Sequence, residues 1–346
     1  MKVDSNKDLK ADYGLVSVLI PAYQAENSIK NMMDSLQAQT YENWEAVIIN
    51  DGSTDRTGEI LEKMAADDPR IHCYYQENAG VAAARGKALS LAHGDWTLMA
   101  DADDRIPDNY LEVLLKKADQ YHAGMALAGI RYCEEDGRVS RLILPPEGVG
   151  KPDFIHRRLV KLGRETTLAC VVWNKLFKTE AIKDIQFVSD RKYEDIYVMH
   201  RMVDRFDKIA FAPEVQYDYI QQSASVMHTQ KASDRLDVVE AYFRRALYYM
   251  ETGAYSYMDH TLADAYYEYK RTLELRKNAS YDEKEEEKWR KKNPEVCRRF
   301  LETLKTCRRE SRIPHLINRA CFMLKFPGLY DIGSLVKQKA KLSRNV

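Results

Sequence analysis

Three aspartates stand within four positions in the sequence DADD (101–104), directly after the apolar run WTLMA. Such a run is typical of a strand buried on both faces, and unpaired carboxylates are costly to bury at its end. Asp101 and Asp103 are two residues apart, which places both on one side of an extended backbone. Paired carboxylates suit a hard divalent cation, which commonly shares a phosphate when it has few protein ligands. We therefore expect Mg²⁺ or Mn²⁺ bound together with a diphosphate.

Helix capping is the alternative role for aspartates in such loops. Asp104 or Asp108 could cap a helix that begins near NYLEVLL, and Asp55 could cap an earlier helix. Capping does not explain why Asp101 stands at the strand terminus itself.

Strand and helix patterns alternate over the first 130 residues and predict the elements that position these aspartates. Strands are expected at 15–20, 44–50, 71–76 and 96–100, and helices at 27–38, 56–66, 80–92 and 107–121. This order predicts an α/β fold with a mostly parallel sheet between helices, with its ligand crevice at the carboxyl ends of the strands. Tyr23, Asp51 and Asp101 each follow a predicted strand, so we expect all three to face this crevice.

The pattern changes after about residue 124. We expect two strands around an Asp-Gly turn, helical pieces near 154–162 and 193–205, and two short strands near 208–212 and 215–220. The chain after Ser233 is predicted to be helical, with 281–295 a solvated helix or connector. We accordingly predict an α/β catalytic domain over 1–230 and a C-terminal helical region over 231–346.

Composition limits the class of protein. The chain has 346 residues and a formal net charge of zero, which argues against nucleic-acid binding. Residues 288–346 carry a net charge of +12, so the remainder carries −12. The six cysteines form no CxxC pair, and there is no apolar run of the roughly 20 residues that a membrane span needs. We expect a cytoplasmic protein that is able to touch the inner face of the cell membrane.

Four segments occur in an order that resembles family 2 glycosyltransferases with the GT-A fold: VSVLIPAYQAENSI, IINDGSTDRT, ENAGVAAARGKALSLAHGDWTLMADADD and KYEDIYVMHRM. The resemblance covers about residues 15–228. It implies an inverting, metal-dependent enzyme that uses a nucleotide sugar. Two departures are Gly86, where the family usually has Asn, and Met99-Ala100, where it usually has Leu or Phe-Leu.

The resemblance implies a donor site at the strand ends. Asp51 would accept a hydrogen bond from the base, Asp101 would contact the ribose or donor sugar, and Asp103 would bind the metal. His228 would complete the metal shell or touch the diphosphate. The other donor-site residues implied are Pro21, Ala22, Tyr23, Glu26, Gly80, Arg85 and Ala102. Alternatively, Tyr23 is an aromatic residue at the rim of the sheet, and Arg85 pairs with an acid on its own helix.

Catalysis and acceptor binding are assigned by the same resemblance. Asp195 would be the general base with Glu194 beside it, although either could be an ordinary acid in the first turn of a helix. Trp173, Asn174 and Lys175 would line the acceptor side in a loop that faces the site, and an interior position is the alternative for Trp173.

The basic tail suggests a further surface. Apolar residues recur at helical spacing in 313–328, among basic residues, which predicts peripheral membrane contact through 308–345. Packing of this helix on the catalytic domain is the alternative.

We interpret the chain as a glycosyltransferase that moves a sugar, most simply from a UDP-sugar, to a glycan or polyprenyl-linked acceptor in bacterial surface polysaccharide synthesis. A nucleotidyltransferase would need a Gly-rich loop after the first strand, where this chain has PAYQAEN. A scaffold that binds nucleotide sugars without transfer is a further alternative, and a homodimer is left open.

Overall fold

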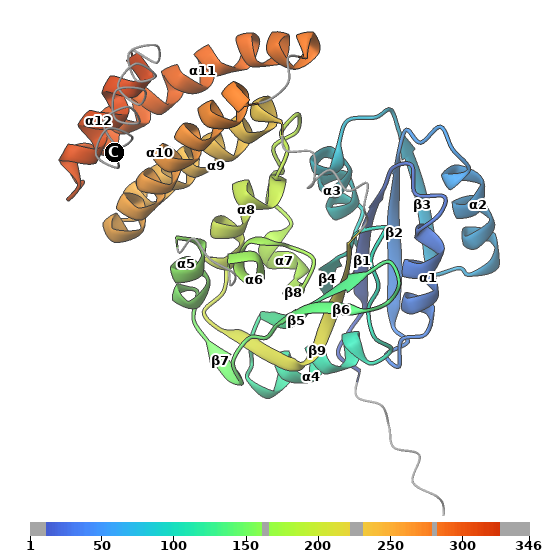
Figure 1. Ribbon diagram of the computed structural model, residues 1–346. Helices are drawn as coiled ribbons and strands as arrows, with labels where there is room; N and C mark the ends of the chain where they lie inside the picture. The colour runs from blue at the N-terminus through green and yellow to red at the C-terminus, as the bar shows by residue number, and fades with distance from the viewer. Residues whose placement is uncertain (1–11, 161–165, 222–230, 279–281, 326–346) are drawn as a thin grey trace, which may run out of the picture. The chain divides into compact units, whose positions relative to one another are not determined.

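The computed structural model describes residues 12–160, 166–221, 231–278 and 282–325 (Figure 1). Two compact units divide the chain. The sheet unit comprises Met1–Ile155, Cys170–Asp190 and Arg201–Gln222, and the helical unit comprises His156–Ala169, Arg191–His200 and Ser223–Val346. The helical unit thus takes in two segments that precede residue 231, where we expect the helical region to begin.

A nine-stranded sheet forms the centre of the sheet unit (Figure 1). Its strand order is β3-β2-β1-β4-β8-β5-β9-β7, and β6 pairs with β5. Strands β8, β6 and β7 run antiparallel to their neighbours, and the other pairings are parallel. The strands are β1 (Val16–Ala22), β2 (Trp44–Asp51), β3 (Ile71–Gln76), β4 (Trp96–Met99), β5 (Met125–Glu134), β6 (Val139–Ile143), β7 (Gly148–Gly150), β8 (Lys175–Lys178) and β9 (Ile209–Gln221).

The helices that alternate with the first strands confirm the predicted α/β fold. They are α1 (Ile29–Gln37), α2 (Thr57–Asp67), α3 (Val81–Ser90) and α4 (Tyr110–Gln120). In α1, Ile29, Met32, Met33 and Leu36 recur at helical spacing and are all buried, so this helix covers the sheet with one apolar face. Shorter helices follow: α5 (Asp153–Leu159), α6 (Thr166–Cys170), α7 (Thr179–Ile182) and α8 (Glu194–Val203).

The prediction of two short strands near 208–212 and 215–220 was wrong, because both belong to β9. The register of β9 against β5 shifts between Ala128 and Gly129, where Ala212 and Gln216 are the successive partners. Pro213 lies in this irregularity and has no N–H for the ladder. The chain therefore bulges instead of turning.

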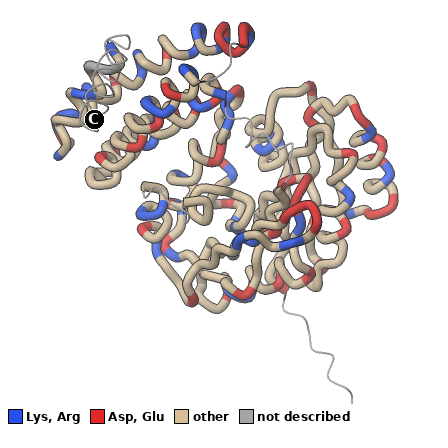
Figure 2. Tube along the Cα trace, in the orientation of Figure 1, with Lys and Arg blue, Asp and Glu red and all other residues tan. Residues whose placement is uncertain are grey.

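Four helices dominate the helical unit: α9 (Ala232–Glu251), α10 (Tyr255–Asn278), α11 (Glu283–Cys307) and α12 (Pro314–Lys325). Acidic residues gather in the first turn of α11 (Figure 2). The charged segment 281–295 is helical, yet Trp289 is only 3 % exposed and packs in the core of this unit. In α12, Ile317, Ala320 and Leu324 are buried in the same core, so this part of the predicted membrane-binding face packs inside the protein. None of the described helices is long and apolar enough to cross a membrane.

Candidate functional site

The parallel strands bring the predicted donor-site residues to one edge of the sheet. Ala22 pairs with Asn50, and Leu19 pairs with Met99, so β1, β2 and β4 end near one another. Tyr23 directly follows β1 and is 54 % exposed. Asp51 ends β2, and Asp101 lies two residues beyond β4. Tyr23, Asp51 and Asp101 therefore lie at one edge of the sheet, as expected from the sequence. We call this edge the strand-end edge.

Asp51 holds the turn between β3 and α3. Its Oδ1 atom accepts hydrogen bonds from Gln76 Nε2 at 2.7 Å and from the backbone N–H of Ala79 at 2.8 Å, and its Oδ2 atom accepts one from the N–H of Gly80 at 2.8 Å. The side chain is buried, and Gly80 has a φ of +86°. Since a carboxylate accepts about four hydrogen bonds, roughly one acceptor position on Asp51 is left for a ligand.

The loop after β1 is tied to the loop after β2. Gln24, with a φ of +51°, accepts the N–H of Thr54 at 2.7 Å through its Oε1 atom. Glu26 accepts from the backbone N–H of Arg56 at 3.1 Å and from its Nε at 3.2 Å. Glu26 is thus engaged with Arg56 beside the predicted base pocket. Pro21 and Ala22 are the last two residues of β1.

No aspartate occupies the N-cap position of α2 or α4. The N-cap of α2 is Arg56, and Asp55 lies just before it. Asp55 accepts the N–H of Thr57, the first residue of α2, at 3.0 Å. At α4 the N-cap is Asn109, and no side chain makes a cap hydrogen bond there. Capping by Asp104 or Asp108 is therefore wrong for this helix.

Arg85 supplies the positive partner of Asp101. Its guanidinium donates from Nη2 to Asp101 Oδ1, and the residue is only 3 % exposed. The backbone N–H of Asp101 donates to the hydroxyl of Tyr217 at 2.9 Å. The alternative, that Arg85 pairs with an acid on its own helix, is not the observed pairing. The positive charge of Arg85 on α3 thus balances the negative charge of Asp101 at the strand-end edge.

Asp103 and Asp104 lie in contrasting surroundings. The Asp103 side chain reaches solvent, but loss of hydration and the neighbouring Asp101 carboxylate raise its pKa to about 6. Asp104 is fully buried, and its Oδ1 atom accepts the N–H of Ile220 in β9 at 2.8 Å. Burial, with Asp103 and Asp101 nearby, raises the pKa of Asp104 well above its ordinary value. Asp103 is therefore the carboxylate open to a cation, whereas Asp104 anchors β9.

Few of the described side chains near Asp101 and Asp103 could bind a metal ion. Across the residues that the structure describes, no three His, Cys, Asp or Glu side chains group as a metal site. Asp103 fits a divalent cation because it reaches solvent and lies near the Asp101 carboxylate, whose negative charge a cation would offset. Ala102 is buried between the two carboxylates. His228, the further ligand predicted, lies outside the described residues.

The three predicted acceptor residues are buried within the sheet unit. Trp173 is 6 % exposed, and its ring stacks on Tyr219 with centroids 5.5 Å apart and an interplanar angle of 12°. Asn174 donates from Nδ2 to the carbonyl of Ala128 at 3.0 Å, and its Oδ1 accepts from Lys175 Nζ at 2.7 Å. Lys175 begins β8 instead of lying in a loop. The acceptor role of these residues stays a prediction.

Glu194 and Asp195 form the first turn of α8, as predicted. Glu194 is 7 % exposed, and Asp195 is partly buried. Both residues belong to the helical unit. The roles of Asp195 as general base and of Glu194 as its neighbour stay predictions.

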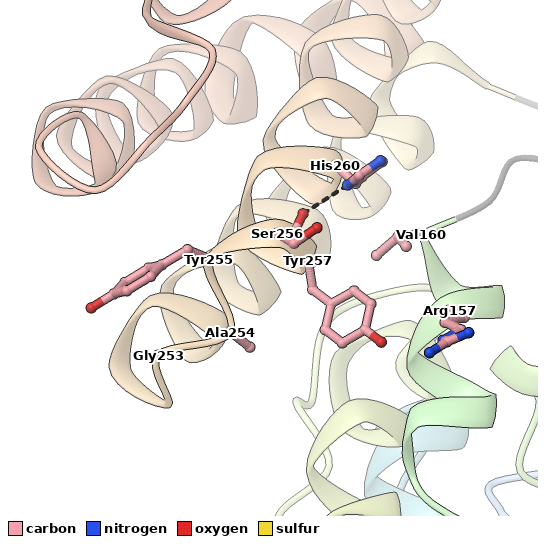
Figure 3. Close-up of a pocket in the computed structure, with 8 residues that line it drawn as sticks. All are labelled: Arg157, Val160, Gly253, Ala254, Tyr255, Ser256, Tyr257 and His260. Carbon is pink, nitrogen blue, oxygen red and sulfur yellow. Dashed lines mark hydrogen bonds between the residues drawn. The ribbon is translucent and has the colours of Figure 1, made fainter.

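A hollow of about 530 Å³ in the helical unit contains none of the predicted site residues (Figure 3). Its lining includes Arg157 from α5 and His260 from α10. Tyr257 points into it, and this ring stacks on His156 with centroids 5.6 Å apart. The hollow is thus distinct from the strand-end edge.

Gln24, Gln76 and Tyr217 were missed by the sequence reasoning, although each bonds to the site or shapes it. Gln76 is a polar residue at a predicted strand end, which is the signal that led to Asp51 and Asp101. Tyr217 could not be found in this way, because its strand comes from a distant part of the sequence.

The fold is that of GT-A glycosyltransferases. The chain superposes on the crystal structure of TarS residues 1–349 from S. aureus in complex with UDP-GlcNAc, with a TM-score of 0.66 and 19 % identity, over 89 % of this chain and 88 % of that one. A mannosyltransferase from Pyrobaculum calidifontis, solved with GDP-Man and Mn²⁺, gives a TM-score of 0.50 at 14 % identity, over 90 % and 87 % of the two chains. Both likenesses concern the fold.

Sequence comparison gives the family. Residues 17–186 match the model of Glycosyl transferase family 2, and this part of the chain belongs to that family. The chain is 32 % identical over 209 residues to glycosyltransferase GlyA of Streptococcus pneumoniae, and 28 % identical over 238 residues to GlyG of the same species. These alignments cover 59 % and 67 % of this chain, but 30 % of GlyA and 79 % of GlyG. A putative teichuronic acid biosynthesis glycosyltransferase, TuaG of Bacillus subtilis, is 33 % identical over 148 residues, which cover 42 % of this chain and 59 % of TuaG.

Proposed function

We propose that this glycosyltransferase is an inverting, metal-dependent enzyme that transfers a sugar from a UDP-sugar to a glycan or polyprenyl-linked acceptor. The arrangement of side chains at the strand-end edge is the observation that supports binding of a UDP-sugar. It joins the exposed ring of Tyr23, the acceptor position left on Asp51, and a charged group made of Arg85, Asp101 and Asp103. Such an edge offers an aromatic ring and a carboxylate to the uracil and charged groups to the diphosphate and the sugar.

Asp103 would hold Mg²⁺ or Mn²⁺, with Asp101 and His228 as further contacts. A cation with one or two carboxylate ligands completes its shell with phosphate oxygens and water, which suits a nucleotide diphosphate. When bound, the ion would neutralise charge on the departing diphosphate. Arg85 would hold the Asp101 carboxylate in place through one oxygen, so that its second oxygen could contact the ribose or the sugar.

Asp195 would remove the proton from the acceptor hydroxyl, a contribution of about 10²–10⁴-fold to the rate. Asp195 lies in the first turn of α8, shortly after Asp190 and Tyr193, which have positive φ values. This position supports the role. Trp173, Asn174 and Lys175 would shape the acceptor side from within, since all three are buried.

A surface polysaccharide as the product is supported by the similarity to TuaG, whose name refers to teichuronic acid biosynthesis. Membrane contact would then fall to the basic residues of 308–345, because the buried face of α12 is already packed.

The decisive experiment measures UDP release from a panel of UDP-sugars with Mn²⁺, with and without EDTA, in the presence of acceptor glycans. We expect UDP release that depends on both the metal and the acceptor. Binding of UDP without any turnover would favour a scaffold, and metal-independent turnover would contradict the cation site.

A further inference from the structure

A buried ion network in the helical unit contacts the segment that precedes Asp195. Its centre is formed by Asp237 and Glu240 on α9, which are 2 % and 1 % exposed. Carboxylates this deeply buried are rare unless they are paired. Their partners therefore indicate what the network holds in place.

Part of the network joins neighbouring helices. Lys292 of α11 lies 2.6 Å from Asp237 Oδ1, and Arg299 of α11 donates to Glu240 Oε1 at 2.8 Å. Arg244, one turn along α9, also donates to Glu240. Burial alone would raise the pKa of Glu240, but Arg244 and Arg191 hold it below its ordinary value. Burial raises the pKa of Asp237, and Lys292 acts against this shift. The ion pairs of Lys292 and Arg299 join α11 to α9.

The rest of the network holds residues 191–197. Arg191 donates from Nε to Glu240 Oε2 at 3.0 Å, and the backbone N–H of Lys192 donates to Asp237 Oδ2 at 3.1 Å. Tyr197 donates its hydroxyl to the backbone carbonyl of Asp237 at 2.7 Å. The beginning of α8 is therefore held from both sides of Asp195, at Lys192 and at Tyr197.

The backbone of this segment needs such support. Asp190 and Tyr193 have φ values of +60° and +62°, although neither is glycine. Residues with side chains keep this conformation only where the surroundings fix it, and such residues cluster at functional sites. A network that served only to join α9 to α11 would not need Arg191 or the N–H of Lys192.

We propose that Asp237 and Glu240 are positioning residues that hold the 190–197 segment so that Asp195 is presented in one fixed orientation. This inference rests on the proposed function, in which Asp195 is the general base. Arg191 is the residue of the segment whose side chain pairs with both Glu240 and Asp237. Its loss would loosen the segment, which would keep its contacts at Lys192 and Tyr197, and would leave Glu240 paired with Arg244 and Arg299.

The test compares Arg191→Met with Arg276→Met. Arg276 pairs with Glu286 between α10 and α11 and is not among the residues described above that hold 190–197, so it controls for the loss of one ion pair in the same unit. We expect Arg191→Met to lower kcat about tenfold or more, as small misplacements of catalytic groups do. The dissociation constant for UDP should stay within about twofold of the unchanged protein in both variants. Arg191→Lys should recover part of the kcat.

Hydrogen exchange of the peptide that covers 190–197 provides a readout that does not depend on turnover. We expect faster exchange in Arg191→Met and unchanged exchange in Arg276→Met, because only the first variant loosens the segment that contains the Lys192 amide. Unchanged exchange in Arg191→Met, or unchanged kcat despite faster exchange, overturns the inference. If the unchanged protein transfers no sugar, the proposed function fails, and the exchange result alone decides whether the network holds the segment.

Discussion

Arg85, buried on α3, donates a hydrogen bond to Asp101, which lies beyond the end of β4. This contact joins two elements on the strand-end edge and gives one of the three neighbouring aspartates a fixed positive partner. The three aspartates therefore differ in their surroundings. Asp101 is paired with Arg85, Asp103 is open to a cation, and Asp104 is buried against β9.

Replacement of Arg85 should therefore weaken donor binding. In Arg85→Met the Asp101 carboxylate loses its partner, and the local negative charge would repel a diphosphate. We expect the dissociation constant for UDP with Mn²⁺ to rise about tenfold or more, because losing one partner of a buried charged pair costs several kcal/mol. Titration calorimetry measures this. Arg205→Met, which breaks an exposed pair with Asp184, is the matched control and should bind UDP as the unchanged protein does. Equal affinity in both variants would contradict the role of Arg85.

Asp103 and Asp195 should separate donor binding from transfer. Asp103→Ala removes the carboxylate open to a cation, so we expect the increase in UDP affinity that Mn²⁺ produces to disappear. Asp195→Ala should bind UDP and Mn²⁺ normally but lose about 10²–10⁴-fold in kcat if it removes the base. Calorimetry and UDP release measure the two effects. Retention of turnover in Asp195→Ala would remove it as the base, and an unchanged Mn²⁺ effect in Asp103→Ala would remove Asp103 as the metal ligand.

Local sequence patterns predicted much of this arrangement but not all of it. The apolar runs that became β1, β2 and β4 placed Tyr23, Asp51 and Asp101 at one edge, since parallel strands end together. The partners of these residues depend on contacts that no local pattern encodes. Tyr217 reaches Asp101 from a strand 116 residues away, and β8 enters between β4 and β5 from after residue 170. Trp289 lies in a highly charged segment and is nevertheless buried in the helical core, which the charge of its neighbours in the sequence did not indicate.

Gly80, just before α3, and Gly86, inside it, should respond oppositely to replacement by alanine. Gly80 precedes the helix with φ +86° and ψ 161°, a region that is almost exclusive to glycine. Gly80→Ala should lower the free energy of unfolding by about 1–3 kcal/mol and loosen the turn that Asp51 holds, even though no atom lies within 4 Å of the added Cβ. Gly86 lies inside the helix and also has open space around it, so Gly86→Ala should raise stability by about 0.5–1 kcal/mol. Urea unfolding measures both variants. A stabilising Gly80→Ala would show that the turn adopts another conformation in solution.

Stability should depend on pH through Asp264 on α10. Burial raises the pKa of this carboxyl to about 7, although Arg245 and His260 act against the shift. The folded state thus binds a proton that the unfolded state, with a pKa near 3.9, has already lost. The free energy of unfolding should therefore fall as the pH rises from about 4 through 7.

Asp264→Asn removes this titration. We expect the variant to exceed the unchanged protein in stability by about 1–3 kcal/mol at pH 8 and to match it more closely at pH 5, since each unit of pKa difference corresponds to about 1.4 kcal/mol. Thermal unfolding at a series of pH values measures the difference. Glu274→Gln, at an exposed position on the same helix, is the control and should follow the unchanged protein within about 0.5 kcal/mol throughout. Parallel pH curves for Asp264→Asn and the unchanged protein would mean that the Asp264 carboxyl is ionised in the folded state, with water or a cation beside it.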